Sequence, residues 1–102
     1  CAEPSYLVDA MVANAESYHD VEIVHMVAMG KAGYAQPGME SHFRHNALFV
    51  GGTTRKAVAE GRGDYTPCFF YRIPSLFTNG SLPVDVALVQ ATPPDEDGIM
   101  SL

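Results

Sequence analysis

The sequence has few cysteines and few basic residues. Its two cysteines, Cys1 and Cys68, match no zinc-binding spacing and are too few for a disulfide framework, so a reducing, cytoplasmic compartment is expected. Six Lys and Arg residues stand against twelve Asp and Glu, which gives a net charge of −6. A negative surface repels the phosphates of nucleic acids and of anionic membranes. We therefore expect neither nucleic acid nor membrane as a partner.

Long hydrophobic runs are also missing. No apolar run approaches the roughly 20 residues that a membrane-spanning helix needs. With 47% hydrophobic and 18% charged residues, the 102-residue chain has the composition of a globular domain rather than a disordered segment. The helical pattern begins almost at Cys1, and a strand-like pattern begins at Ile99 just before the sequence stops. We therefore expect residues 1–102 to be one incomplete domain, truncated at both ends.

The sequence lacks a spaced set of metal ligands. His42 and His45 are three positions apart, whereas two ligands on the same face of a strand are two apart. Adding His25 with Cys68 or Asp95 produces no zinc-binding spacing. We expect no metal, and we interpret a histidine at a strand end as part of a polar pocket lining.

The most informative stretch is residues 42–70. Residues 47–50 form a short apolar run typical of a strand covered on both faces, and the glycine pair that follows permits a sharp turn. Two threonines can then cap a helix that ends at Gly61. An aromatic, β-prone run at 64–70 predicts the next strand. So short a connection implies a parallel β-α-β unit.

The remaining chain extends this unit into a sheet. Pro4 and apolar residues at spacings of three and four predict an amphipathic helix over 4–18. Residues 31–41 are expected to be a loop, and 93–98 a rigid turn. The fold class is therefore α/β, an open and mainly parallel sheet flanked by helices. Its four predicted strands are residues 21–28, 46–50, 64–70 and 84–91.

Ligands of open parallel sheets bind beyond the carboxyl ends of the strands. Four segments follow those ends and are expected to converge on one rim: residues 29–34, 51–54, 68–71 and 92–98. The helix start at Thr53, with Arg55 and Lys56, resembles an anion site but lacks the P-loop spacing, so we interpret the threonines as caps. Cys68 stands between Pro67 and two phenylalanines, which predicts a packing role.

Several runs, in order over nearly the whole chain, carry a family resemblance: residues 21–26, 29–31 with Tyr34, 43–46, 53–61, 64–70, 73–76 and 83–88, with 93–95 and Gly98. Together they resemble the amino-terminal domain of the acetyl-CoA hydrolase/transferase family. The likeness is closest to the branch of 4-hydroxybutyrate and butyrate CoA-transferases. It implies a CoA-transferase-like fold and the transfer of coenzyme A between short-chain carboxylic acids.

The resemblance also implies a mechanism whose central residue is not in this chain. In the family a glutamate attacks the acyl-CoA thioester and forms an acyl-glutamyl anhydride, releasing CoA. CoA then attacks the glutamyl carbonyl, which gives a glutamyl-CoA thioester and the free acid, so one difficult exchange is split into easier steps. That glutamate and the glycine-rich CoA-binding segment lie in the carboxyl-terminal half. No glutamate here matches the motif, so we assign no catalytic residue and expect the fragment alone to be inactive.

What the resemblance leaves to this chain is one wall of the substrate pocket. The expected partners are acyl-CoA, short-chain carboxylic acids, the carboxyl-terminal half of the enzyme and, in a homo-oligomer, further copies of the chain. Coenzyme A takes part as a substrate, bound as acyl-CoA. The resemblance implies no metal. An apolar, aromatic wall with few polar groups suits a short aliphatic acid. The residues expected to form it are His25, Met29, Tyr34, Gly51, Gly52, Phe69 and Phe70.

Three other functions remain open from the sequence. An acyl-CoA hydrolase would differ in admitting water in place of the acceptor acid. A non-catalytic interaction module would use an uncovered sheet edge to pair with another chain. A nucleotide-binding domain is disfavoured because no acidic ribose partner follows the helix start at Thr53 at the expected distance.

Overall fold

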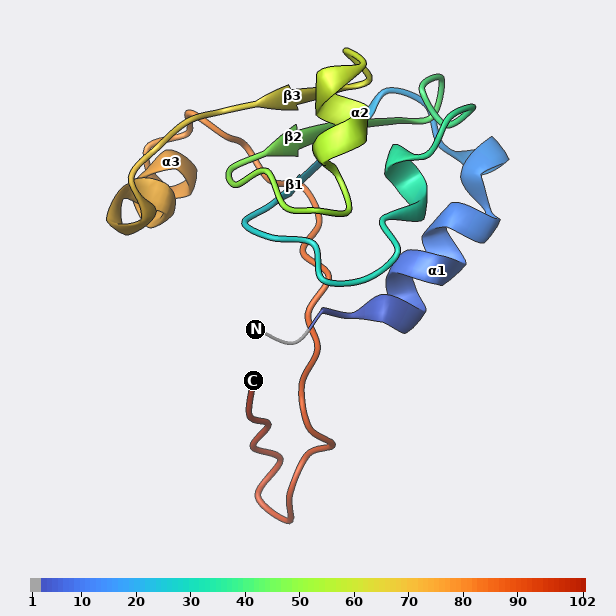
Figure 1. Ribbon diagram of the computed structural model, residues 1–102. Coiled ribbons are helices and arrows are strands. Elements are labelled where there is room, and N and C mark those ends of the chain that lie inside the picture. Colours follow the sequence, from blue (N-terminus) through green and yellow to red (C-terminus); the bar gives the residue numbers. More distant parts are fainter. Residues whose placement is uncertain (1–2) are drawn as a thin grey trace.

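The computed structural model describes residues 3–102 and contains a three-stranded parallel sheet with strand order β1-β2-β3. The strands are β1 (Val21–His25), β2 (Phe43–Ala47) and β3 (Gly63–Tyr65), and α2 (Arg55–Ala59) connects the last two (Figure 1). The predicted α/β class and the parallel β-α-β unit are therefore confirmed.

The two faces of this sheet differ in polarity. Side chains alternate between faces along a strand, so Phe43, His45 and Ala47 share one face of β2. All three are buried, and Phe43 belongs to an apolar core that also contains Ala57 of α2 and Tyr34 of the short 3₁₀ helix η2 (Gly33–Ala35). The opposite face is polar. It carries Glu22, Arg44, Asn46 and Asp64.

The amino-terminal helix α1 (Ser5–Ala13) is shorter than the predicted 4–18. It ends because Asn14 competes for helix carbonyls: its side-chain Nδ2 donates to the Ala10 carbonyl at 2.8 Å. A 3₁₀ turn, η1 (Ala15–Ser17), continues the chain. The helix packs on η2, where a Cβ on Gly33 would lie 3.1 Å from a methyl of Val12, so this close approach favours glycine.

Helix α2 ends as predicted but begins differently. Gly61 adopts a positive φ of 74°, and the Arg62 amide donates to the Ala57 carbonyl at 2.8 Å, a typical glycine-terminated helix end. At the start, the expected threonine cap is not formed, because the buried Thr54 hydroxyl has no hydrogen-bond partner. Instead, the Arg55 amide donates to the Gly51 carbonyl at 3.0 Å.

Three predicted strands are displaced or shortened. β1 stops at His25 rather than at residue 28, and β2 covers 43–47 rather than 46–50, so the apolar residues 48–50 lie beyond the last strand pair. β3 ends at Tyr65 because Pro67 has no N–H to donate to the ladder. The chain then forms a 3₁₀ turn, η3 (Phe70–Arg72), and the helix α3 (Ile73–Thr78).

The fourth predicted strand, 84–91, is wrong. These residues form no strand, and Val86 is 75% exposed although its sequence context is strongly β-prone. The chain leaves the sheet and extends away from it (Figure 1). A strand needs a neighbouring backbone to bond to, and 84–91 has none among the described residues. Residues 99–102 likewise form no strand, whereas the predicted turn at 93–98 is present.

The helices of residues 3–102 are all too short or too polar to cross a membrane.

Candidate functional site

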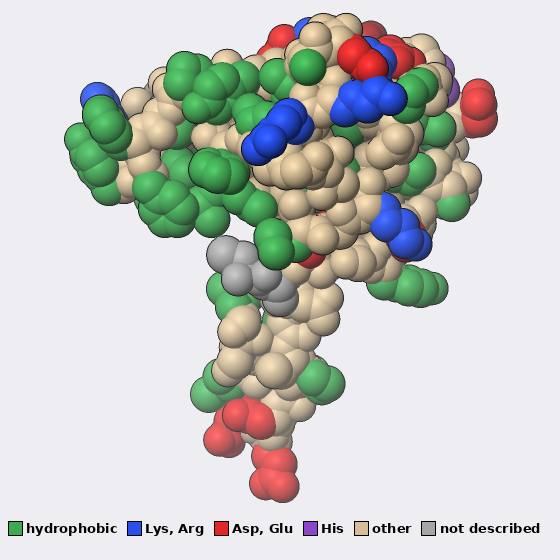
Figure 2. Space-filling view, in the orientation of Figure 1, with side chains coloured by type: hydrophobic (Ala, Val, Ile, Leu, Met, Phe, Trp, Pro, Cys, Tyr) green, Lys and Arg blue, Asp and Glu red, His purple; other side chains and the backbone are tan. Residues whose placement is uncertain are grey.

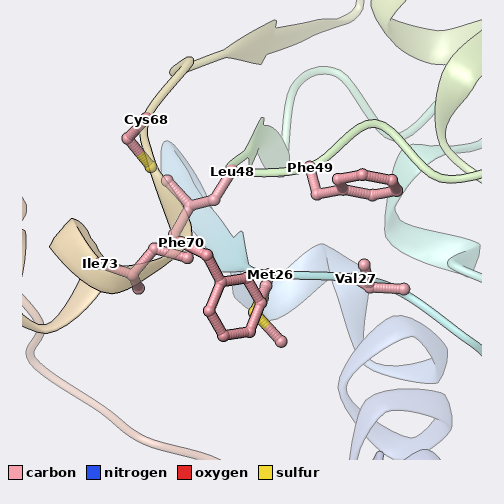
Figure 3. A pocket seen from close by; sticks show the side chains of 7 residues that line it. All are labelled: Met26, Val27, Leu48, Phe49, Cys68, Phe70 and Ile73. Atoms are coloured by element: carbon pink, nitrogen blue, oxygen red, sulfur yellow. The ribbon is translucent and has the colours of Figure 1, made fainter.

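An apolar cavity of about 370 Å³ lies beyond the carboxyl ends of the strands. Figure 3 shows the side chains that surround it. Met26 and Val27 directly follow β1, and Leu48 and Phe49 directly follow β2. The chain beyond β3 supplies the rest of the wall, namely Cys68, Phe70 and Ile73. The expected location of the site, at the edge where parallel strands end, is thus occupied by a hydrophobic hollow.

Only part of the expected rim converges. The segment 68–71 lines the cavity through Cys68 and Phe70, whereas no residue of 29–34 or 51–54 lines it. Gly51 lies near the loop after β1, since a Cβ on it would lie 3.8 Å from the Ala28 carbonyl oxygen. The fourth segment, 92–98, is exposed on the extended tail and does not take part, because the strand expected to deliver it does not form.

Of the seven residues expected to form the wall, Phe70 lines this cavity. Phe69 instead lines a neighbouring hollow of about 630 Å³ beside α3, and its ring stacks on Tyr71 at 5.8 Å. Met29 is 76% exposed, and Gly52 is also exposed. Sequence reasoning missed most of the lining. The signal for Leu48 and Phe49 was present, because they belong to the apolar run 47–50 that was assigned to a strand interior.

His25 and Tyr34, also expected in the wall, do not line the cavity but form a cluster with His45, in which His25 is half-buried and the other two are buried. Tyr34 is 3% exposed, and its hydroxyl is hydrogen-bonded to Nε2 of His25. The His25 ring stacks on His45, with ring centroids 4.5 Å apart and planes 21° from parallel. His45 is itself hydrogen-bonded through Nδ1 to the Ile23 carbonyl at 3.2 Å. The cluster therefore ties η2 to the ends of β1 and β2.

Burial keeps this cluster uncharged at neutral pH. Desolvation, with a smaller contribution from neighbouring His45, lowers the pKa of His25 to about 4. Burial also lowers the pKa of His45. Burial raises the pKa of the Tyr34 hydroxyl, and the negative charge of Glu3 raises it further. Neutral rings can stack closely without charge repulsion. In residues 3–102, no three His, Cys, Asp or Glu side chains gather as a metal ion would require.

Glu3 connects the start of α1 to the loop after β1. Its Oε2 accepts hydrogen bonds from the backbone amides of Met29 and Gly30, each at 2.7 Å. A Cβ on Gly30 would lie 2.5 Å from Oε1 of the same carboxylate, so an alanine at this position would force the Glu3 carboxylate to shift. This loop includes the Met26 and Val27 side of the cavity.

The polar face of the sheet is joined by side-chain hydrogen bonds. Asn46 donates to Glu22 of β1 at 2.7 Å and accepts from Thr66, just past β3, at 2.8 Å. Arg44 makes two hydrogen bonds to Asp64, at 2.6 and 2.7 Å, and these hold the pKa of the Asp64 carboxyl below its usual range. These side chains link the three strands. None of them lines the apolar cavity, whose wall contains no charged residue.

Comparison with known proteins identifies the family. The sequence profile of the acetyl-CoA hydrolase/transferase N-terminal domain matches residues 1–102. The chain belongs to this family. The resemblance noted in the sequence is thereby confirmed, and the cavity lies in an acetyl-CoA hydrolase/transferase N-terminal domain.

Three relatives extend this result. The chain is 63% identical, over 97% of its length, to the 4-hydroxybutyrate coenzyme A transferase of Clostridium kluyveri. It is 40% identical, over 99% of its length, to a succinyl-CoA:acetate/propanoyl-CoA:succinate CoA transferase of Fasciola hepatica. A butyryl-CoA:acetate CoA-transferase of Anaerostipes caccae is 37% identical over 59% of the chain. The chain spans only 23%, 21% and 14% of these curated relatives.

Proposed function

We propose that this chain is part of a CoA-transferase that moves coenzyme A between short-chain carboxylic acids, such as 4-hydroxybutyrate or butyrate and acetate. The reaction would proceed through a glutamyl-CoA thioester on a glutamate outside these residues. The 63% identity to a 4-hydroxybutyrate coenzyme A transferase supports this choice of substrate class. Within the chain, the supporting observation is the apolar cavity beyond the strand ends.

The cavity suits the hydrocarbon part of an acyl group. Its lining offers hydrophobic side chains and one thiol, so an aliphatic chain can be buried there while the reacting carboxyl points outward. Excluding water from an acyl-glutamyl anhydride or thioester favours transfer to an acid over hydrolysis. The two lobes of the site would then divide the work: this domain binds the acyl chain, and the carboxyl-terminal half supplies the nucleophile and binds CoA.

The other expected wall residues take indirect roles in this proposal. His25, which directly precedes Met26, is held in place by its hydrogen bond to the buried Tyr34. Gly51 lies beside the loop after β1, next to the Ala28 carbonyl, and Gly52 is exposed. Met29 and Phe69 are exposed where the remaining enzyme would cover them. The chain alone would be inactive, and the low cysteine content favours a cytoplasmic enzyme.

The reaction is tested with the full-length protein and acetyl-CoA, with and without butyrate or 4-hydroxybutyrate. Formation of the new acyl-CoA, without release of free CoA, is the expected result. Acid-independent release of CoA would instead identify a hydrolase. No consumption of acetyl-CoA, butyryl-CoA or 4-hydroxybutyryl-CoA under any condition would refute the proposal.

The role of the cavity is tested by replacing one of its aromatic residues. Phe70→Ala should raise KM for butyrate about tenfold and KM for acetate much less, because the lost contacts are with the longer hydrocarbon chain. Tyr71→Ala is the matched control, since Tyr71 is adjacent and similarly exposed but does not line this cavity. Equal effects on both acids, or equal effects of both variants, would contradict the assignment.

The exposed apolar surface supports a second candidate function, a non-catalytic interaction module. Figure 2 shows hydrophobic side chains gathered at the α3 end of the molecule and along the tail. Phe69, Phe70 and Val86 are each at least 70% exposed. Such surfaces usually mark contacts with other chains. Light scattering of the 102-residue chain would show concentration-dependent assembly in this case, and a monomer at high concentration would contradict it.

A further inference from the structure

We propose that Glu3 is a positioning residue that fixes the loop after β1, and with it the Met26 and Val27 wall of the cavity, for binding of the acyl group. The inference rests on the proposed function, which it extends to a residue outside the cavity. Glu3 does not line the hollow. It acts through the backbone of the loop that does.

The hydrogen bonds make this contact specific. One carboxylate oxygen accepts two successive backbone amides, those of Met29 and Gly30, at 2.7 Å each. The bonds join parts of the chain that are 26 and 27 residues apart. Hydrogen bonds to an ionised acceptor are roughly twice as strong as neutral ones. β1 has already ended at His25, so the sheet offers these amides no partner and Glu3 takes that place.

The loop is short, and both of its ends are held. His25 is paired with Ala47 in the sheet, and Met29 and Gly30 are bonded to Glu3, which leaves only residues 26–28 between the two fixed points. Met26 and Val27 face the cavity within this span. Releasing the Glu3 end would let these side chains shift, which would weaken their contacts with a bound acyl chain.

A second contact between the same elements is much weaker. Lys31 pairs with Asp9 of α1 at 3.3 Å, but the two side chains are 84% and 55% exposed. Exposed ion pairs contribute about 0–1 kcal/mol. The backbone hydrogen bonds of Glu3 are therefore the stronger connection, and Asp9, on the helix that begins just after Glu3, provides a control carboxylate.

The test uses steady-state kinetics of the full-length enzyme. Glu3→Ala should raise KM for the carboxylic acid about tenfold while kcat falls less than about threefold, because binding rather than chemistry is disturbed. Glu3→Gln keeps an amide oxygen in the accepting position and should restore most of the affinity. Asp9→Asn should leave KM unchanged. A wild-type KM in Glu3→Ala, or equal losses in Glu3→Ala and Asp9→Asn, would overturn the proposal.

Gly30→Ala disturbs the same contact from the other side. Its Cβ would lie 2.5 Å from Oε1 of Glu3, so the carboxylate must shift from the position in which its Oε2 accepts the two amides. Gly30→Ala should therefore raise KM in the wild-type background but add little to Glu3→Ala. Full additivity of the two effects would overturn the proposal, because independent sites add and coupled ones do not.

Hydrogen exchange separates this inference from the proposed function. In Glu3→Ala the amides of Met29 and Gly30 should exchange about tenfold faster or more, since an opened loop loses protection. Unchanged exchange overturns the positioning role whatever the kinetics. A wild-type enzyme without CoA-transferase activity would refute the proposed function and the acyl-binding part of the inference, while exchange would still decide whether Glu3 holds the loop.

Discussion

Strand β2 contains no β-branched residue, whereas the tail segment 84–91 contains three valines, yet only β2 forms a strand. In β2, Phe43 and Ala47 are 2% and 0% exposed, and the strand is paired on both sides, with β1 and with β3. In the tail, Val86 is 75% exposed, and its segment pairs with nothing among residues 3–102. The difference shows that apolar, β-branched sequence makes a strand only when a neighbouring backbone is available.

The largest expected contrast between the two regions is in unfolding free energy. Phe43→Ala should lower the stability of the 102-residue chain by about 3–5 kcal/mol, because it leaves a cavity in the core. Val86→Ala should lower it by less than about 0.5 kcal/mol, since an exposed side chain loses few contacts. Urea denaturation measures both. A loss above about 1 kcal/mol in Val86→Ala would mean that the tail packs on the body.

A smaller contrast involves two asparagines. Asn46→Ala should cost about 1–3 kcal/mol, because Asn46 is buried and its loss leaves Glu22 and Thr66 without partners. Asn79→Ala, in the exposed segment after α3, removes only a local bond to the Ser81 amide and should cost less than about 0.5 kcal/mol. Equal losses in thermal or urea unfolding would contradict the importance of the inter-strand bonds.

The next effect in size is the pH dependence of the free energy of unfolding, which we expect to arise from His25 in the sheet. The pKa of His25 is about 4 in the folded chain and 6.5 in its ordinary state, so the unfolded chain binds more protons between these values. Stability should therefore fall as pH decreases from about 6.5 to 4, by about 1–2 kcal/mol after allowance for the partly exposed ring. His25→Gln should flatten this dependence in urea unfolding, whereas exposed His19→Gln should not. An unchanged slope in His25→Gln would contradict the assignment.

The smallest effect is expected for surface ion pairs. A double-mutant cycle on Arg44 and Asp64 should give a coupling free energy of about 0.5–1 kcal/mol, since their two hydrogen bonds are well formed but partly exposed. The same cycle on Lys31 and Asp9 should give nearly zero. High salt should reduce the first value. A larger coupling for the lysine pair would contradict this order.

Local signals in the sequence predicted the β-α-β unit well. The end of α2 is determined by Gly61, whose positive φ is a property of one residue, and the β-prone runs before and after α2 are equally local features. Strand ends were less predictable, because Leu48 and Phe49 look like strand residues until the length of the neighbouring strand is known. The prediction of a strand at 84–91 is wrong for the same reason, since the pairing of a strand with a neighbour is not a local property of its sequence.

The candidate site shows the same limit. The topology of a parallel sheet predicts that the site lies at the edge where the strands end, and the aromatic run after β3 predicts that Phe70 lines it. The bond between His25 and Tyr34 depends on how η2 folds back over β1, and no spacing in the sequence encodes it. The contact of Glu3 with the loop after β1 is likewise not encoded by any spacing, because it joins residues 26 and 27 positions apart.

The hydrogen-bonded face of the sheet also safeguards correct folding. A strand displaced by one residue turns every side chain to the opposite side. Such a slip of β2 would drive Arg44 and Asn46 into the hydrophobic interior and expose Phe43 to water. A shifted register would therefore cost free energy in two ways, by burying polar side chains and by exposing an aromatic one. Both costs disfavour a misaligned sheet as a trapped folding state.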